Sequence, residues 1–259
     1  MAFLQIDLKS KALGRKAHLN VFLPVDVDNK QPGPYKTLYL LHGIFGNSSS
    51  WVTSSCVQRY ADAKHLCVVM PDGENGFYTD HPDYMNNFSR YVGEELVQAT
   101  REMLPLSDKR EDTMLGGFSM GGYGALYNGL KYADTFSRII SFSAAIHLLE
   151  FEPGDPRRQL VCNEDQVMGP YREAVKSDKN PAICLHQLQE KVEQGRASYP
   201  QMYMICGLQD SLIDANRSFH EKLVKAGVPV IYREYPGKHE FEFWNQHVET
   251  MITWLMEEN

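Results

Sequence analysis

The stretch "MLGGFSMGGYGALYNGLKYA", residues 114–133, places one serine between two glycine pairs. A strand-like run precedes Ser119, a helix-like run follows it, and residues 117–121 match the pattern G-x-S-x-G. In this setting the serine stands on a sharp turn with strained backbone angles. Side chains two residues to either side would collide with the neighbouring strand and helix, which explains Gly117 and Gly121. The stretch predicts a nucleophilic serine, and a glycine-rich helix start that binds phosphate or only packs stays as the alternative.

Strands and helices alternate on both sides of this stretch. Alternating runs at 3–8 and 17–23 predict an antiparallel opening pair. Continuous apolar runs predict buried strands at 37–43, 65–73, 112–117, 138–144, 201–207 and 230–236, and helical patterns fall at 47–64, 91–104, 214–226 and near the end of the chain. The helix within 47–64 is expected to be capped by a serine. This order predicts an α/β fold with a mainly parallel sheet covered on both faces, and ligands at the carboxyl ends of its strands.

One segment interrupts the alternation. Residues from about 146 to 198 are rich in turn formers and carry only short helical patterns. A connection of this length within a compact domain is usually functional. We expect a cap-like insertion at about 146–198 over the site, within a single domain that spans residues 1–259.

The composition excludes several classes of protein. A net charge of −7 argues against a nucleic-acid partner, which would require clustered lysine and arginine. The five cysteines are scattered without a C-x-x-C pair, which indicates reduced thiols and no zinc site. No apolar run reaches the roughly 18 residues that cross a bilayer, and the N-terminus lacks the apolar core of a signal peptide. We expect a soluble, cytoplasmic protein without a membrane partner, and a homo-oligomer stays open.

A histidine and an acid must follow a serine of this kind along the chain. His239 lies in "YPGKHEFEFW", between the last predicted strand and the last helix, and is the predicted general base. His247 lies on the apolar stripe of that helix and is expected to pack. The other histidines after the serine, namely His147, His186 and His220, are expected to be solvated or structural.

Two aspartates compete for the acid in "MICGLQDSLIDANRSF". Asp210 follows a predicted strand by a short loop and reaches the carboxyl edge of the sheet. Asp214 falls where the next helix begins, so it is explained as an N-cap or first-turn acid. We predict Asp210, with Asp165 and Asp178 in the insertion as weaker rivals.

An oxyanion-binding loop is predicted in "LLHGIFGNSSSW", at the end of an early buried strand. The turn there can direct the amide of Ile44 at the site, and the second donor is the amide of Met120, the residue after the nucleophile. His42 precedes the serine and is expected to anchor this loop by hydrogen bonds.

These motifs together carry a family resemblance. With "FLP", "YVGEELVQATREMLPLS", "GGFSMGGYGAL" and "CGLQD", they span nearly the whole chain in one order. The chain resembles the putative esterase (esterase D) family of α/β-hydrolases, within it most closely the tributyrin-esterase type. The resemblance implies an α/β-hydrolase fold without a metal or organic cofactor. It places the catalytic triad on Ser119, Asp210 and His239, and the oxyanion amides on Ile44 and Met120.

The expected function is that of a serine carboxylesterase, which hydrolyses short-chain acyl esters of small molecules through an acyl-enzyme intermediate. Feruloyl or acetyl-xylan esterase activity and acyl transfer on the same triad are alternatives. S-formylglutathione hydrolases resemble the sequence "SGLTC" in the first oxyanion loop and carry a histidine directly before the nucleophilic serine. This chain has "HGIFG" and Phe118, which disfavours that branch.

Overall fold

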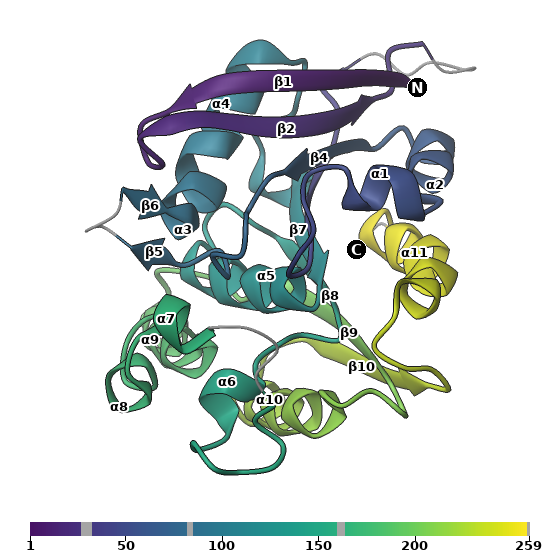
Figure 1. Cartoon of the computed structure of the whole chain (residues 1–259). Coiled ribbons are helices and arrows are strands. Elements are labelled where there is room, and N and C mark those ends of the chain that lie inside the picture. Colours follow the sequence, from purple (N-terminus) through teal and green to yellow (C-terminus); the bar gives the residue numbers. More distant parts are fainter. Residues whose placement is uncertain (27–32, 82–84, 160–163, 258–259) are drawn as a thin grey trace.

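Eight strands form one sheet in the computed structural model, which describes residues 1–26, 33–81, 85–159 and 164–257 (Figure 1). In spatial order they are β1 (Ala2–Ser10), β2 (Arg15–Leu23), β4 (Cys67–Pro71), β3 (Thr37–Leu41), β7 (Thr113–Phe118), β8 (Arg138–Phe142), β9 (Gln201–Gly207) and β10 (Val230–Tyr235). β2 runs antiparallel to β1 and β4, and from β4 to β10 all neighbours are parallel. The predicted mainly parallel sheet with an antiparallel opening pair is confirmed.

Helices cover both faces of this sheet (Figure 1). One face is covered by α4 (Leu96–Met103), α5 (Met120–Lys131) and α10 (Ile213–Lys225), and the other by α1 (Ser50–Ser54), α2 (Val57–Ala63) and α11 (Phe241–Leu255). Side chains alternate between the two faces along each strand: in β3, Tyr39 and Leu41 join one hydrophobic cluster, whereas Leu38 and Leu40 join the other. Burial on both faces explains why the central strands read as unbroken apolar runs.

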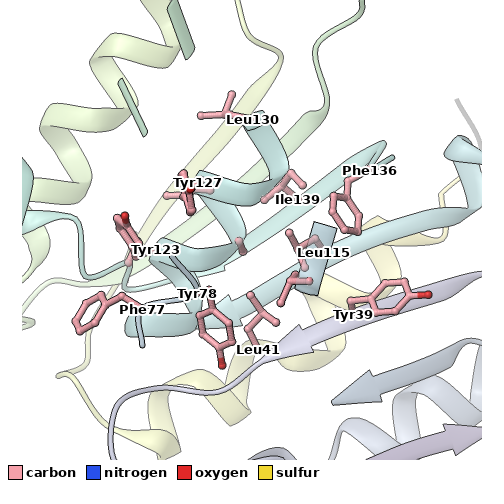
Figure 2. Packing of buried hydrophobic residues seen from close by; sticks show 14 of the residues in the cluster. Tyr39, Leu41, Phe77, Tyr78, Leu115, Tyr123, Tyr127, Leu130, Phe136 and Ile139 are labelled. Carbon is pink, nitrogen blue, oxygen red and sulfur yellow. The ribbon is translucent and has the colours of Figure 1, made fainter. Parts of the chain in front are cut away.

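The layer beneath α5 shows how closely sheet and helix pack (Figure 2). Leu115 of β7 and Ile139 of β8 pack on one side of α5, Tyr123 and Tyr127 of α5 point to its other side, and all four side chains are buried in one cluster. This packing holds α5, and therefore the turn that leads into it, in a defined position above the sheet.

Two predicted helices differ in detail from the structure. The segment 47–64 forms two short helices, α1 and α2, instead of one, and the residue at the N-cap of α1, Ser49, makes no side-chain capping hydrogen bond. The predicted helix at 91–104 begins earlier: α3 (Phe88–Arg90) and the π-helical turn η2 (Tyr91–Glu95) lead into α4. A short hairpin of β5 (Asp80–His81) and β6 (Asn86–Asn87) precedes α3.

The segment between β8 and β9 carries α6 (His147–Glu150), α7 (Glu164–Met168), α8 (Tyr171–Ala174) and α9 (Pro181–Glu193). The expectation of only short helical stretches is wrong for α9, which has 13 residues. The Asn180 side chain accepts the amide of Ala182 and Pro181 opens the helix, which is a regular helix start. Because Leu185 and Leu188 join the hydrophobic cluster around α5, this helix belongs to the core layer.

Within the described ranges, no helix is long and apolar enough to span a membrane. No group of histidine, cysteine, aspartate and glutamate side chains in those ranges is arranged to hold a metal ion. Cys56, Cys67, Cys184 and Cys206 are free thiols, and Cys162 lies outside the described residues.

Candidate active site

Ser119 occupies the turn between β7 and α5 in a strained conformation. Its φ is 54° and its ψ −117°, a region that residues with a side chain rarely adopt. The backbone holds it there: the Ser119 amide donates to the Phe142 carbonyl at 2.9 Å, and the Ser119 carbonyl accepts from the Ala145 amide at 3.0 Å. Such strain persists only where the surroundings impose it, which is typical of a functional position.

The two glycines of the motif are required by close backbone approach. A Cβ at Gly117 would lie 2.4 Å from the carbonyl oxygen of Gly121, and a Cβ at Gly121 would lie 2.4 Å from that of Leu41. Backbone atoms cannot move aside as a flexible side chain can. The steric reason predicted for both glycines therefore holds in the structure.

Ser119, His239 and Asp210 are connected by hydrogen bonds. The His239 Nε2 atom lies 2.9 Å from the Ser119 Oγ atom, and the Nδ1 atom lies 2.9 Å and 3.1 Å from the two Asp210 carboxylate oxygens. An ionised carboxylate only accepts hydrogen bonds, so Nδ1 carries the hydrogen and Nε2 is left to accept the serine hydroxyl. The structure thus brings together three residues that are far apart in the sequence.

Asp210 is ionised although its side chain is fully buried. Burial disfavours the charge, but the hydrogen bond from His239, the charge of His239 and the Leu212 amide outweigh it and lower the pKa of Asp210. The Leu212 amide donates to one carboxylate oxygen at 2.8 Å. A buried, ionised acid suits the task of holding an imidazole in one tautomer.

The rival acids lie elsewhere. Asp214 is in the first turn of α10, as predicted, with its carboxylate half exposed and 3.6 Å from Arg217. Asp165 pairs with Arg158 at 2.6 Å and Asp178 with Lys131 at 2.8 Å. In the described contacts, none of these three acids reaches His239.

The predicted oxyanion residues, Ile44 and Met120, line one pocket together with Ser119 and His239. Met120 is the first residue of α5, and the first amides of a helix have no partner within it and carry its positive dipole. The other amide is that of Ile44, which follows Gly43 directly in the sequence. Both residues thus lie at the pocket that is also lined by Ser119.

His42 anchors the loop that carries Ile44 by hydrogen bonds, as predicted. The amide of Gly73 donates to its Nε2 atom at 2.9 Å, so Nδ1 carries the hydrogen and donates to the Gly43 carbonyl at 2.7 Å. That carbonyl belongs to the same planar peptide group as the Ile44 amide. The His42 hydrogen bond therefore fixes the direction in which the Ile44 amide points.

The pocket around Ser119 has a volume of about 130 Å³. Besides the four residues already named, it is lined by Phe77, Ala145, His147, Gln159, Ser211 and Leu212. His147 is buried and its Nε2 atom lies 2.8 Å from the Gln159 carbonyl, which agrees with the expected structural role. In addition, His147 lines the pocket. The sequence predicts that the insertion lies over the site, and His147 and Gln159 of that insertion do line the pocket. It does not single out the individual lining residues, because they lie in segments without a repeating pattern.

Comparison with known proteins now identifies the family. The sequence model described as "Putative esterase" matches residues 10–255. The chain belongs to the putative esterase family. An acetyl esterase from Caldicellulosiruptor saccharolyticus is 36% identical over 265 residues, which cover 98% of each chain. The expectation of a carboxylic ester hydrolase of the serine-esterase class is confirmed.

Solved structures of other esterases and hydrolases share the fold. The S-formylglutathione hydrolase FrmB of Staphylococcus aureus superposes with a TM-score of 0.82 and 27% identity, over 99% of both chains. A ferulic acid esterase superposes with a TM-score of 0.78 over 98% of both chains, and at 21% identity it supports the fold alone. The α/β-hydrolase fold is confirmed.

Proposed function

We propose that this esterase hydrolyses short-chain acyl esters with Ser119 as nucleophile. The supporting observation is the hydrogen-bonded row of Ser119, His239 and Asp210 at the wall of a small pocket. His239 takes the serine proton as Oγ attacks the ester carbonyl, and Asp210 stabilises the charged imidazole. His239 then protonates the departing alcohol, and water activated by the same histidine hydrolyses the acyl-enzyme.

The negative charge that develops on the carbonyl oxygen is bound by the amides of Ile44 and Met120. Losing one such donor typically costs on the order of 100-fold or more in turnover. The fixed peptide after Gly43 and the amino end of α5 supply these donors without rearrangement during the reaction.

The size of the pocket supports a short acyl group. A cavity on the order of 150 Å³ accommodates benzene, a group of six carbon atoms, and this pocket has about 130 Å³. An acetyl or butyryl group fits into that space, whereas an octanoyl chain is larger than the space and would extend out of it. The insertion at about 146–198, which contributes His147 and Gln159 to the lining, serves in this proposal as a cap within a single domain.

Chain-length preference tests this proposal. We expect kcat/KM of the wild type to be highest for p-nitrophenyl acetate and butyrate, and at least about 10-fold lower for the octanoate, because each misfitting methylene changes binding measurably. Hydrolysis is followed by p-nitrophenol absorbance at equal substrate concentrations. Equal rates for acetate and octanoate would contradict the short-chain assignment and leave the esterase class intact.

S-formylglutathione is the second candidate substrate, because the 27% identical FrmB is described as its hydrolase. Its formyl group is small enough for the pocket, whereas the "HGIFG" loop and Phe118 argue against it. Comparing S-formylglutathione with p-nitrophenyl acetate decides between them: a kcat/KM more than about 100-fold higher for the thioester would favour this branch.

A substitution of His42 tests the oxyanion loop. We expect His42→Ala to lower kcat about 10-fold or more with little change in KM, because the Ile44 amide loses its fixed direction and acts mainly in the transition state. His42→Asn retains a donor near the position of Nδ1 and should recover part of the loss. Steady-state kinetics with p-nitrophenyl acetate measure both, and an equal loss in the two variants would show that the Gly43 hydrogen bond is not the cause.

A further inference from the structure

Two neighbouring aromatic residues in the segment between β4 and β5 have strained backbone conformations. Phe77 and Tyr78 have φ angles of 50° and 55°, and bulky residues rarely adopt this left-handed region. Both side chains are buried. Backbone strain persists only where the surroundings impose it, and it is concentrated at functional sites. The strain therefore points to a task for these two side chains.

The contacts of Tyr78 explain how the strained conformation is held. Its hydroxyl accepts the His42 amide at 3.0 Å and donates to the His42 carbonyl at 3.1 Å. Its ring lies against Gly124 of α5, where an added Cβ would be 2.5 Å from a ring carbon. The end of β3 and α5 thus fix Tyr78 from two sides, and the backbone of its neighbour Phe77 is fixed with it.

Phe77 lines the pocket of Ser119 and is the largest side chain of that lining. Its ring meets Tyr123 of α5 edge to face, with 5.7 Å between the ring centroids and an angle of 70° (Figure 2). Tyr123 is itself held in place, because its hydroxyl donates to the Lys179 carbonyl and its ring stacks on Tyr127. Phe77 is therefore a fixed part of the pocket wall.

We propose that Phe77 sets the upper limit of the acyl chain length, because its ring occupies space into which a longer chain would extend. This proposal rests on the proposed function, in which the pocket of about 130 Å³ holds the acyl group. Removal of a phenyl ring frees the space of six carbon atoms, and benzene, a group of that size, fills a cavity on the order of 150 Å³. An octanoyl chain has four carbon atoms more than a butyryl chain. The space of one phenyl ring is enough for that difference.

The test measures kcat/KM for p-nitrophenyl acetate, butyrate and octanoate in the wild type, Phe77→Leu and Phe77→Ala. We expect the octanoate-to-acetate ratio of kcat/KM to rise at least about 10-fold in Phe77→Ala, because a single methylene in an apolar pocket already changes discrimination by about 10-fold or more. Phe77→Leu should show a smaller rise. In Phe77→Ala, kcat/KM for the octanoate should also exceed the wild-type value. Damage to the structure lowers activity with every ester, so a gain with one ester reports on the pocket.

Phe77→Gly provides the test if Phe77→Ala does not fold. Both changes remove the ring, and loss of a buried ring destabilises a protein. Glycine adopts a φ of 50° without strain, so it restores part of that stability. Thermal unfolding identifies the folded variants, and Phe77→Gly should show the same rise of the octanoate-to-acetate ratio.

Phe136 supplies the matched control. It is buried in the same hydrophobic cluster as Phe77 and also meets a tyrosine edge to face, with 6.2 Å between its ring centroid and that of Tyr39 (Figure 2). Within the part of the chain that the structure describes, it is not among the residues that line the pocket of Ser119. Phe136→Leu and Phe136→Ala should lower thermal stability as the Phe77 variants do, and leave the octanoate-to-acetate ratio within about twofold of the wild type.

Acetate esters of longer alcohols distinguish the acyl half of the substrate from the alcohol half. Ethyl, butyl and octyl acetate vary the alcohol at a constant acyl group, and their hydrolysis is followed by the release of acid. Phe77→Ala should leave the ratio of octyl to ethyl acetate near the wild-type value. If that ratio rises while the octanoate-to-acetate ratio does not, Phe77 faces the departing alcohol and the proposal is wrong.

The outcomes separate this inference from the proposed function. If the wild type prefers short acyl chains and the folded Phe77 variants keep its octanoate-to-acetate ratio, the role of Phe77 is wrong and the short-chain esterase proposal stands. An equally large change of the ratio in the Phe136 variants would also overturn the role of Phe77, because the effect would then follow from general loosening of the core. If the wild type itself hydrolyses the octanoate as fast as the acetate, the short-chain proposal fails and this inference fails with it.

Discussion

Ser119→Ala is expected to lower kcat for p-nitrophenyl butyrate by at least about 10,000-fold, because removal of the nucleophile leaves only the oxyanion amides and substrate binding. The fold should persist, since alanine and serine bear the same strain at a φ of 54°. Hydrolysis rates and thermal unfolding of the purified variant and wild type, measured side by side, check both statements. Retention of more than a few per cent of the wild-type rate would contradict the assignment.

Ser141 supplies the control for this experiment. It is also buried, on the neighbouring strand β8, and its hydroxyl donates to the Gly122 carbonyl. Ser141→Ala removes a hydroxyl of similar surroundings and should leave kcat within a few-fold of the wild type. Ser119→Gly is a second test of the same position. This variant should be inactive, yet its free energy of unfolding should be higher by about 1 kcal/mol or more, because glycine relieves the backbone strain.

The residues predicted from the sequence are those whose role is visible in a short segment. Gly117 and Gly121 flank the serine at the spacing that the turn requires, and the structure shows the backbone contacts that a Cβ would meet. His239 is predictable because it falls between a strand and a helix. Asp210 is distinguished from Asp214 because Asp214 has a local explanation at a helix start, where the structure places it. The alternation of apolar strand runs with helical patterns is enough to predict a mainly parallel sheet with helices on both faces.

Features that depend on distant contacts were missed for a physical reason. β4 lies between β2 and β3, a crossover that no local pattern encodes. Ser143 reads as a strand residue, and neither its positive φ nor its contact with Trp244, 101 residues further along the chain, leaves a trace in the sequence. The start of α9 is different, because Asn180 before Pro181 is a readable signal that the turn-rich composition of the insertion obscured.

Asp210→Asn is expected to lower kcat about 1,000- to 10,000-fold while leaving the shape of the site intact. An amide at this position can donate to Nδ1, which then loses its hydrogen, so Nε2 is protonated and cannot accept the proton of Ser119. KM for p-nitrophenyl acetate should change little, since the pocket lining does not include Asp210. Steady-state kinetics of the purified variant measure both parameters.

Asp214→Asn is the matched control, because the same change is made four residues away on a carboxylate that pairs with Arg217 at the surface. Exposed ion pairs of this kind contribute about 0 to 1 kcal/mol, so we expect kcat within about twofold of the wild type. A large loss in Asp214→Asn together with a small one in Asp210→Asn would reverse the assignment of the acid. Equal, moderate losses in both would mean that neither carboxylate orients His239, and the 2.9 Å contact between Asp210 and Nδ1 would then have a purely structural role.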